Sequence, residues 1–187
     1  MIRHLTLADY RTMPWANGRG TTLELARLDG PDGMIWRLSI ASVVENGPFS
    51  LFPGVDRILT VIDGPGFRLV GSGMAMEAAP WVPIAFPGDV AIAAWGVTAP
   101  SMDFNLMAAR DHCRASLTFL GMLPDTALAQ TAILALDPGS VRVDDRVHAL
   151  ARHDLLLLDR GQIATLSGTQ LRCDLQVRDA GVPLLAL

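Results

Sequence analysis

The chain has 187 residues, of which 50% are hydrophobic and 18% are charged, so it can bury a core and is not expected to be disordered. Its net charge of −4 argues against a nucleic-acid-binding protein, which is usually basic. Pro83, Pro87 and Asp89 interrupt the most hydrophobic stretch, and the N-terminus lacks the pattern of a secretory signal. We therefore expect a soluble cytoplasmic protein with neither a nucleic-acid nor a membrane partner.

Short apolar runs separated by Gly, Pro, Asn and Asp follow one another along the whole chain. The runs that we expect to be strands are residues 22–27, 36–44, 57–62, 67–70, 90–95, 115–120, 132–136, 153–158 and 171–177. Long helices are not expected. This spacing of strands and turns is typical of an all-β sandwich or barrel with antiparallel strands.

The two halves of the chain share a weak repeat. Residues 67–70 and 86–92 are echoed by residues 141–144 and 151–157, because each pair combines a strand, a gap, and an aspartate that leads into an apolar strand. The repeat predicts two packed β-units, residues 1–110 and residues 111–187. We place the candidate pocket in the first unit, because nothing in the second unit stands out chemically.

The most informative stretch is residues 36–64. Two strand-like runs, 36–44 and 57–62, flank a segment rich in turn residues, as in an antiparallel pair. The period-2 alternation of a strand places Arg37 and Ser39 on one face, and Arg57 lies at the start of the second run.

This stretch and its neighbours carry a resemblance to a known family. The blocks are Trp36-Arg-Leu-Ser39, Phe49-Ser50, Phe52-Pro-Gly-Val-Asp-Arg57, Pro14-Trp-Ala-Asn-Gly-Arg-Gly-Thr21, Phe86-Pro-Gly-Asp89 and Asp103-Phe-Asn105. In their order and content they resemble the HutD/Ves family of cupin-fold proteins. The resemblance implies a cupin-type antiparallel β-barrel, or jelly roll, in a bicupin-like arrangement.

The same resemblance implies a functional context. HutD members are associated with bacterial histidine utilisation, where they are thought to bind a pathway compound, and Ves members are linked to cold and stress responses. The chain departs from the family pattern at Ala16, where the family often has lysine, and at Arg19, which interrupts what is often a glycine triplet in the family. Both positions lie in the expected lid of the pocket and bear on the identity of the ligand.

No cofactor or metal site is expected. Ser50 and Phe52 stand where a metal-binding cupin has two histidines, and phenylalanine cannot bind a metal. Cys113 and Cys173 are isolated thiols, so neither a zinc site nor a disulfide framework is indicated. The sequence also lacks a nucleophile motif and a nucleotide-binding glycine loop, which favours a binding protein over an enzyme.

The polar candidates for ligand binding are Arg57, Arg37 and Ser39. A guanidinium in a pocket can bind a carboxylate with two parallel hydrogen bonds. The alternative for Arg57 is an ion pair with a neighbouring acid at a strand end, and the same alternative applies to Arg37.

Further candidates surround this group. Trp15 and Asn17 belong to the expected lid, where an indole can stack and an amide can form hydrogen bonds; the alternatives are a core cap and a turn. Glu24 either faces the ligand or pairs with an arginine, and Phe49 and Phe52 either line the pocket or fill the barrel. 

Asp103 and Asn105 come late in the first unit. If buried, both side chains need hydrogen-bond partners, which a ligand or the arginines could supply. The alternative is a local turn with backbone caps at residues 101–103.

The function that we expect first is the metal-independent binding of a small carboxylate metabolite, with urocanate and N-formylglutamate implied by the resemblance. One alternative is a cupin isomerase or lyase that uses Asp56, Glu24 or a histidine as acid or base. Another is an interaction module whose pocket is filled by Phe49, Phe52, Trp36 and Met side chains. A homodimer remains open as the assembly.

Overall fold

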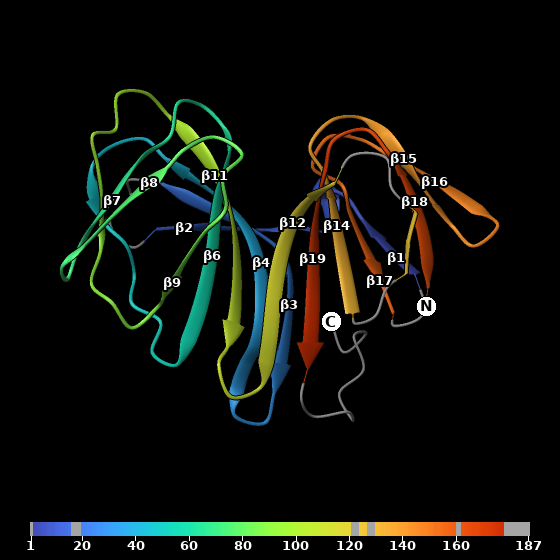
Figure 1. The fold of residues 1–187 in the computed structure, drawn as a ribbon, viewed down its shortest axis with the longest axis horizontal. Coiled ribbons are helices and arrows are strands. Elements are labelled where there is room, and N and C mark those ends of the chain that lie inside the picture. The colour runs from blue at the N-terminus through green and yellow to red at the C-terminus, as the bar shows by residue number, and fades with distance from the viewer. Residues whose placement is uncertain (1, 16–19, 121–123, 127–129, 160–161, 178–187) are drawn as a thin grey trace. The chain divides into compact units, whose positions relative to one another are not determined.

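The computed structural model describes residues 2–15, 20–120, 124–126, 130–159 and 162–177 (Figure 1). These residues form antiparallel strands and one short 3₁₀ helix, Leu7–Asp9, so the all-β expectation is confirmed. The chain divides into two compact units, Arg11–His112 and Met1–Tyr10 with Cys113–Leu187. In the described part of the chain, no helix is long and apolar enough to span a membrane.

The unit Arg11–His112 contains two antiparallel sheets (Figure 1). In spatial order, the six strands of the larger sheet are β2 (Arg11–Pro14), β3 (Thr21–Gly30), β4 (Gly33–Val43), β11 (Ser101–Ala109), β6 (Val55–Asp63) and β9 (Ile84–Pro87). The four strands of the smaller sheet are β5 (Gly47–Pro48), β10 (Ala93–Trp95), β7 (Phe67–Gly71) and β8 (Met74–Ala78). Two facing antiparallel sheets make the sandwich that the turn spacing predicts.

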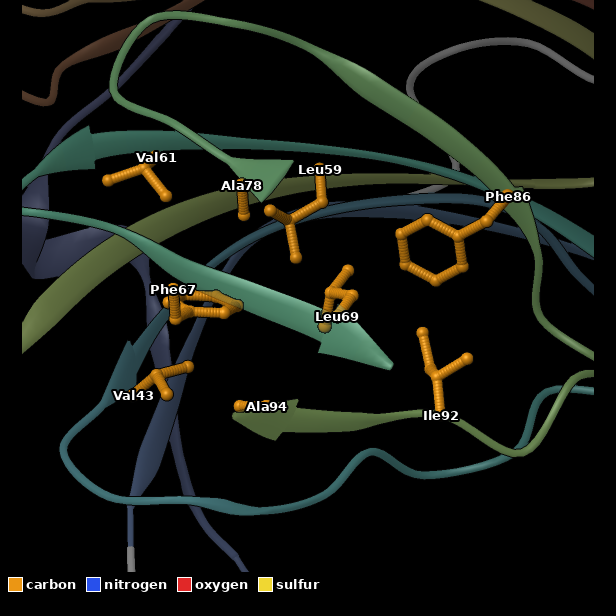
Figure 2. Packing of buried hydrophobic residues seen from close by; sticks show 9 residues of the cluster. All are labelled: Val43, Leu59, Val61, Phe67, Leu69, Ala78, Phe86, Ile92 and Ala94. Atoms are coloured by element: carbon orange, nitrogen blue, oxygen red, sulfur yellow. The ribbon is translucent and has the colours of Figure 1, made fainter. Parts of the chain in front are cut away.

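The core of this unit draws side chains from both sheets, and Figure 2 shows them pointing toward one another. Its members are Val43, Leu59, Val61, Phe67, Leu69, Ala78, Phe86, Ile92 and Ala94. On β7, buried Phe67 and Leu69 alternate with exposed Arg68, which is the pattern of a strand with one apolar face. Burying one such Leu or Phe side chain stabilises a fold by about 1.5–3 kcal/mol.

The second unit repeats the plan of one larger and one smaller sheet. The larger sheet consists of β1 (Ile2–Leu5), β17 (Leu155–Leu158), β14 (Gln130–Ala135), β19 (Gln170–Val177) and β12 (Cys113–Leu120). The smaller sheet consists of β13 (Pro124–Thr126), β18 (Ile163–Ser167), β15 (Gly139–Val143) and β16 (Arg146–Leu150). Its core is Ile133, Ala135, Val141, Val143, Leu150, Leu156 and Leu158.

Two local features differ from the sequence-based expectation. Strand β1 pairs with β17, so the first ten residues belong with the C-terminal unit, whereas the division at residue 110 had grouped them with the first unit. The strand expected at 90–95 begins only at Ala93, because Val90 N donates to Pro87 O in a turn. The apolar run from Val90 to Ile92 is therefore a connection outside the sheets, and its Val90 and Ile92 side chains pack against the core.

Candidate functional site

A cavity of about 310 Å³ lies within the unit Arg11–His112. Odd-numbered residues of β4 and β11 form one wall, because alternate side chains of a strand point to the same face. The strand register places Ser39 of β4 opposite Asn105 of β11, which brings the polar residues of the two strands together. We call this space the arginine cavity, after Arg37 and Arg57 in its wall. Its volume is at the lower end of the range for small-molecule sites.

The structure brings most of the predicted site residues together. The predicted residues that line the arginine cavity are Trp15, Arg37, Ser39, Phe49, Phe52, Arg57, Asp103 and Asn105. Glu24 is not in the lining but contacts Arg37. Asn17 lies outside the described residues.

Several residues of the lining were missed. They are Met13, Pro14, Thr22, Ala41, Val43, Pro48, Ser50 and Met107. Strand alternation places Ala41 and Val43 on the same face as Arg37 and Ser39, and Met107 on the same face as Asn105, so these three could have been predicted. Alternation likewise relates Thr22 of β3 to Glu24. Short strands and a loop, which have no periodic signal, supply the others, namely Met13, Pro14, Pro48 and Ser50.

Arg37 is held at the cavity wall by an acid on the next strand. Its Nε lies 2.7 Å from Glu24 Oε2, in an ion pair that is not aligned as a linear hydrogen bond. Burial lowers the pKa of Arg37, and Glu24 partly offsets this shift. Arg37 Nη2 is buried and has no hydrogen-bond partner among the described residues. Because Arg37 lines the cavity, this donor is a candidate contact for an anion bound there.

Arg57 is surrounded by aromatic rings. Its Cζ lies 5.3 Å from the ring centroid of Phe49, 5.4 Å from that of Phe52 and 5.0 Å from that of Phe86. Cations over ring faces are attracted by the ring quadrupole, which offsets part of the cost of burial. Burial still lowers the pKa of Arg57 to about 10, so the side chain remains charged at neutral pH. Phe86 was not predicted as a site residue, although it belongs to one of the family blocks.

A chain of hydrogen bonds links Arg57 to Asp103. Arg57 Nη2 donates to Asn105 Oδ1 at 2.6 Å, and Asn105 Nδ2 donates to Asp103 Oδ1. The expected alternatives, an ion pair of Arg57 with a neighbouring acid and a turn at residues 101–103, are both wrong. Arg57 instead contacts a residue on another strand, and Asp103 and Asn105 lie inside β11.

Asp103 is completely buried, and this burial raises its pKa to about 7 although Arg57 acts in the opposite direction. Its Oδ2 has no hydrogen-bond partner among the described residues. The register between β11 and β6 shifts between Met102 and Asp103, a bulge-like irregularity with one extra residue on β6. Bulges are frequent beside functional sites, where they redirect a side chain.

Trp15 forms part of the wall near the N-terminal end of β3. Its backbone N donates to Gly20 O at 2.9 Å, and its Nε1 donates to Thr22 Oγ1 at 2.9 Å. A Cβ on Gly20 would lie 2.9 Å from the indole, so glycine at this position lets the ring approach the backbone. Contacts with Gly20 and Thr22 therefore fix the position of the indole.

The other acid and base candidates do not lie in the arginine cavity. Asp56 is exposed and pairs with Arg110, because it points away from the face that carries Arg57. None of the four histidines of the chain is in the lining. In the described ranges, no group of three or more His, Cys, Asp or Glu side chains could hold a metal ion.

Comparison with known proteins identifies relatives that match most of the chain. The HutD family matches residues 7–178. An uncharacterized 21.2 kDa protein of the hutC 3′ region in Pseudomonas putida is 37% identical over 84% of this chain and 87% of its own length. Protein Ves of Cronobacter sakazakii is 33% identical over 74% of this chain and 80% of its own length.

Solved structures with a similar fold include a member of the same family. HutD from Pseudomonas fluorescens SBW25 is 34% identical and superposes with a TM-score of 0.85 over 95% of this chain and all of that one. The protein Ylba of E. coli, at 12% identity, shares the fold alone, with a TM-score of 0.71 over 97% of this chain and 93% of its own. The expected cupin-type fold is confirmed. The chain belongs to the HutD family.

Proposed function

We propose that the arginine cavity binds a small carboxylate metabolite without a metal ion. The observation that carries this proposal is the burial of two arginines, Arg37 and Arg57, in the wall of one cavity of about 310 Å³. Buried charges are costly unless they are paired, and a bound carboxylate would pair with the free donor at Arg37 Nη2.

The charge balance around the cavity supports an anionic ligand. Arg37 and Glu24 neutralise each other as an ion pair. Arg57 remains charged, whereas Asp103 is partly protonated near neutral pH because its pKa is raised to about 7. The lining therefore carries a net positive charge below about pH 7, and an anion would compensate it.

A ligand-free interaction module would have a pocket filled by aromatic and methionine side chains. Phe49 and Phe52 lie at the wall and leave the cavity open, and Trp36 is not in its lining. This arrangement favours a small ligand over that alternative.

Membership of the HutD family supports histidine utilisation as the context. A relative in Pseudomonas putida is named for its position beside hutC. We propose that this chain binds a compound of that pathway, with urocanate and N-formylglutamate as the first candidates, and acts as a regulator rather than as a catalyst.

Isothermal titration calorimetry with urocanate and N-formylglutamate tests this function. We expect the double variant Glu24→Gln/Arg37→Gln to lose about 10- to 150-fold in affinity, because it removes a charged hydrogen bond to the ligand without leaving a buried acid unpaired. The matched control is Arg68→Gln, which changes an exposed arginine of β7 and should bind as the wild type does. Wild-type protein that binds neither compound, or equal binding by the double variant, would contradict the proposal.

One observation favours a second candidate, an acid/base enzyme. The carboxyl of Asp103 lines the cavity and has a pKa near 7, where a group can both give and take a proton. Nuclear magnetic resonance of each candidate compound incubated with the protein would detect turnover. Product formation that is abolished in Asp103→Asn would replace the binding proposal with this one.

A further inference from the structure

The arginine cavity contains a second polar group that the binding of a carboxylate does not use. Asp103 has two carboxyl oxygens, and Oδ1 accepts a hydrogen bond from Asn105 Nδ2. Oδ2 is completely buried and has no partner among the described residues, while the Asp103 side chain lines the cavity. A buried acceptor without a donor is costly, so the site is complete only when a donor reaches it.

Arg57 determines which way the Asn105 side-chain amide is oriented. A guanidinium can only donate hydrogen bonds, so the atom of Asn105 that faces it must be the carbonyl oxygen, as found at 2.6 Å. The amide nitrogen of Asn105 then faces Asp103 and donates to Oδ1. The oxygen left over, Oδ2, is the acceptor of this cavity-lining side chain that no described residue satisfies.

We propose that Asp103 Oδ2 is the second recognition point of the arginine cavity and accepts a hydrogen bond from an N–H group of the ligand. The cavity then selects carboxylates that also carry an N–H donor, a class that includes N-acyl amino acids and imidazole carboxylates. This inference rests on the proposed function, because it assigns the carboxylate end of the ligand to the arginines. It adds the requirement that the ligand also carries an N–H donor that reaches Asp103 Oδ2.

The charged groups around Asp103 determine how this recognition depends on pH. Arg57 faces it from β6, and Arg37, with its partner Glu24 of β3, lies in the same wall on β4. The pKa of Asp103 is about 7, so the carboxylate is mostly ionised at pH 8 and mostly protonated at pH 5.5. The ionised form is the strong acceptor at Oδ2, because a proton on Oδ2 makes this atom a donor and a much weaker acceptor.

A matched pair of probes isolates the N–H group. N-acetylglycine and 4-oxopentanoate have the same length and end groups, and differ only in an N–H that is replaced by CH₂. At pH 8 we expect calorimetry to show that wild-type protein binds N-acetylglycine about 10-fold more tightly. At pH 5.5 the ratio of the two affinities should fall toward one. Any effect of pH on the binding of the carboxylate end alone is the same for both probes, so it cancels in the ratio of their affinities.

The variant Asp103→Asn replaces the acceptor at the second recognition point with a donor. Because Arg57 and Asn105 keep their orientation, the new amide must accept from Asn105 with its oxygen and present its NH₂ group to the cavity. We expect this variant to bind 4-oxopentanoate at least as well as N-acetylglycine at every pH. Asp29→Asn, which changes an exposed acid paired with Arg27, is the matched control and should keep the wild-type preference.

The outcomes separate this inference from the proposed function. Equal affinity of the wild type for the two probes at pH 8 would overturn the role of Asp103 and leave carboxylate binding intact. A preference that survives in Asp103→Asn would overturn it too. Failure of both probes to bind to the wild type would count against the function and the inference together.

Discussion

Arg57 is a buried cation whose immediate neighbours are aromatic rings and an amide. The rings of Phe49, Phe52 and Phe86 surround the guanidinium, and hydrogen bonds through Asn105 link it to the acid Asp103. Rings stabilise a cation without neutralising its charge. The site thus keeps a positive group away from water while leaving its charge available to a ligand.

The variant Asp103→Asn also tests the charge state of the buried carboxyl through stability. The folded-state pKa of about 7 lies above the ordinary 3.8, so native Asp103 holds an extra proton between these values. Its contribution to the stability of the wild type therefore falls as pH rises from about 4 to about 7. Asparagine stays neutral. We expect the variant to be more stable than the wild type at pH 8, by roughly 1–4 kcal/mol, and similar to it at pH 4.

Urea unfolding at both pH values measures this difference. Arg57 should keep its hydrogen bond to Asn105 in the variant, so the two proteins differ mainly in one ionisation. A difference in stability that does not change with pH would show that Asp103 ionises normally in the folded protein.

At the level of elements, the turn that follows β9 holds the loop that carries two of the rings. Phe52 N donates to Gly88 O at 2.9 Å, and Gly88 N donates to Val55 O at 2.7 Å. Asp89 Oδ1 accepts from Gly54 N at 2.7 Å and so ties the same two segments together. The block Phe86-Pro-Gly-Asp89 therefore supplies one ring and positions the loop that supplies the others.

Gly88 is the position most sensitive to substitution in this turn. A Cβ there would lie 2.7 Å from Phe52 O and 2.9 Å from Val55 O, both backbone atoms. We expect Gly88→Ala to destabilise the protein by about 1–3 kcal/mol and to weaken the binding of carboxylates, because the loop must move away from Arg57. Thermal unfolding and calorimetry measure the two effects.

The control for this substitution is Gly47→Ala. A Cβ on Gly47 would meet nothing within 4 Å, and its φ is not in the left-handed region. This variant should change stability by less than about 0.5 kcal/mol. Equal effects of the two substitutions would contradict a role of Gly88 in close packing.

At the level of the whole molecule, the N-terminal segment belongs to the C-terminal unit. Strand β1 lies at the edge of its sheet and pairs with β17 over four residues. Two side-chain contacts reinforce the pairing: His4 Nε2 lies 2.8 Å from Asp154 Oδ2, and Tyr10 Oη lies 2.8 Å from His153 O. The first and last parts of the sequence therefore depend on each other for their structure.

The variant Tyr10→Phe tests this dependence. It removes the hydroxyl that contacts His153 O and, at 3.1 Å, Leu5 O, which should cost about 1 kcal/mol. Hydrogen exchange should become faster in β1 and β17 and remain unchanged in β4 and β11, which belong to the other unit. Faster exchange in β4 and β11 alone would contradict this assignment of the N-terminal segment.

Much of the site follows from patterns within single strands. Alternation places Arg37 with Ser39 and Asp103 with Asn105, because the period of two is a local property of the extended backbone. Turn residues between short apolar runs likewise determine that the chain is all-β. Each of these inferences needs only residues that are close together in the sequence.

The partners of these residues were decided by the tertiary structure. Arg57 contacts Asn105 on β11 and Phe86 on β9 rather than the acids beside it in the sequence, because strand register brings distant segments together. The bulge beside Asp103 and the pairing of β1 with β17 have the same origin. Local periodicity determines which face of a strand a side chain occupies, whereas only the pairing of strands determines what that side chain meets.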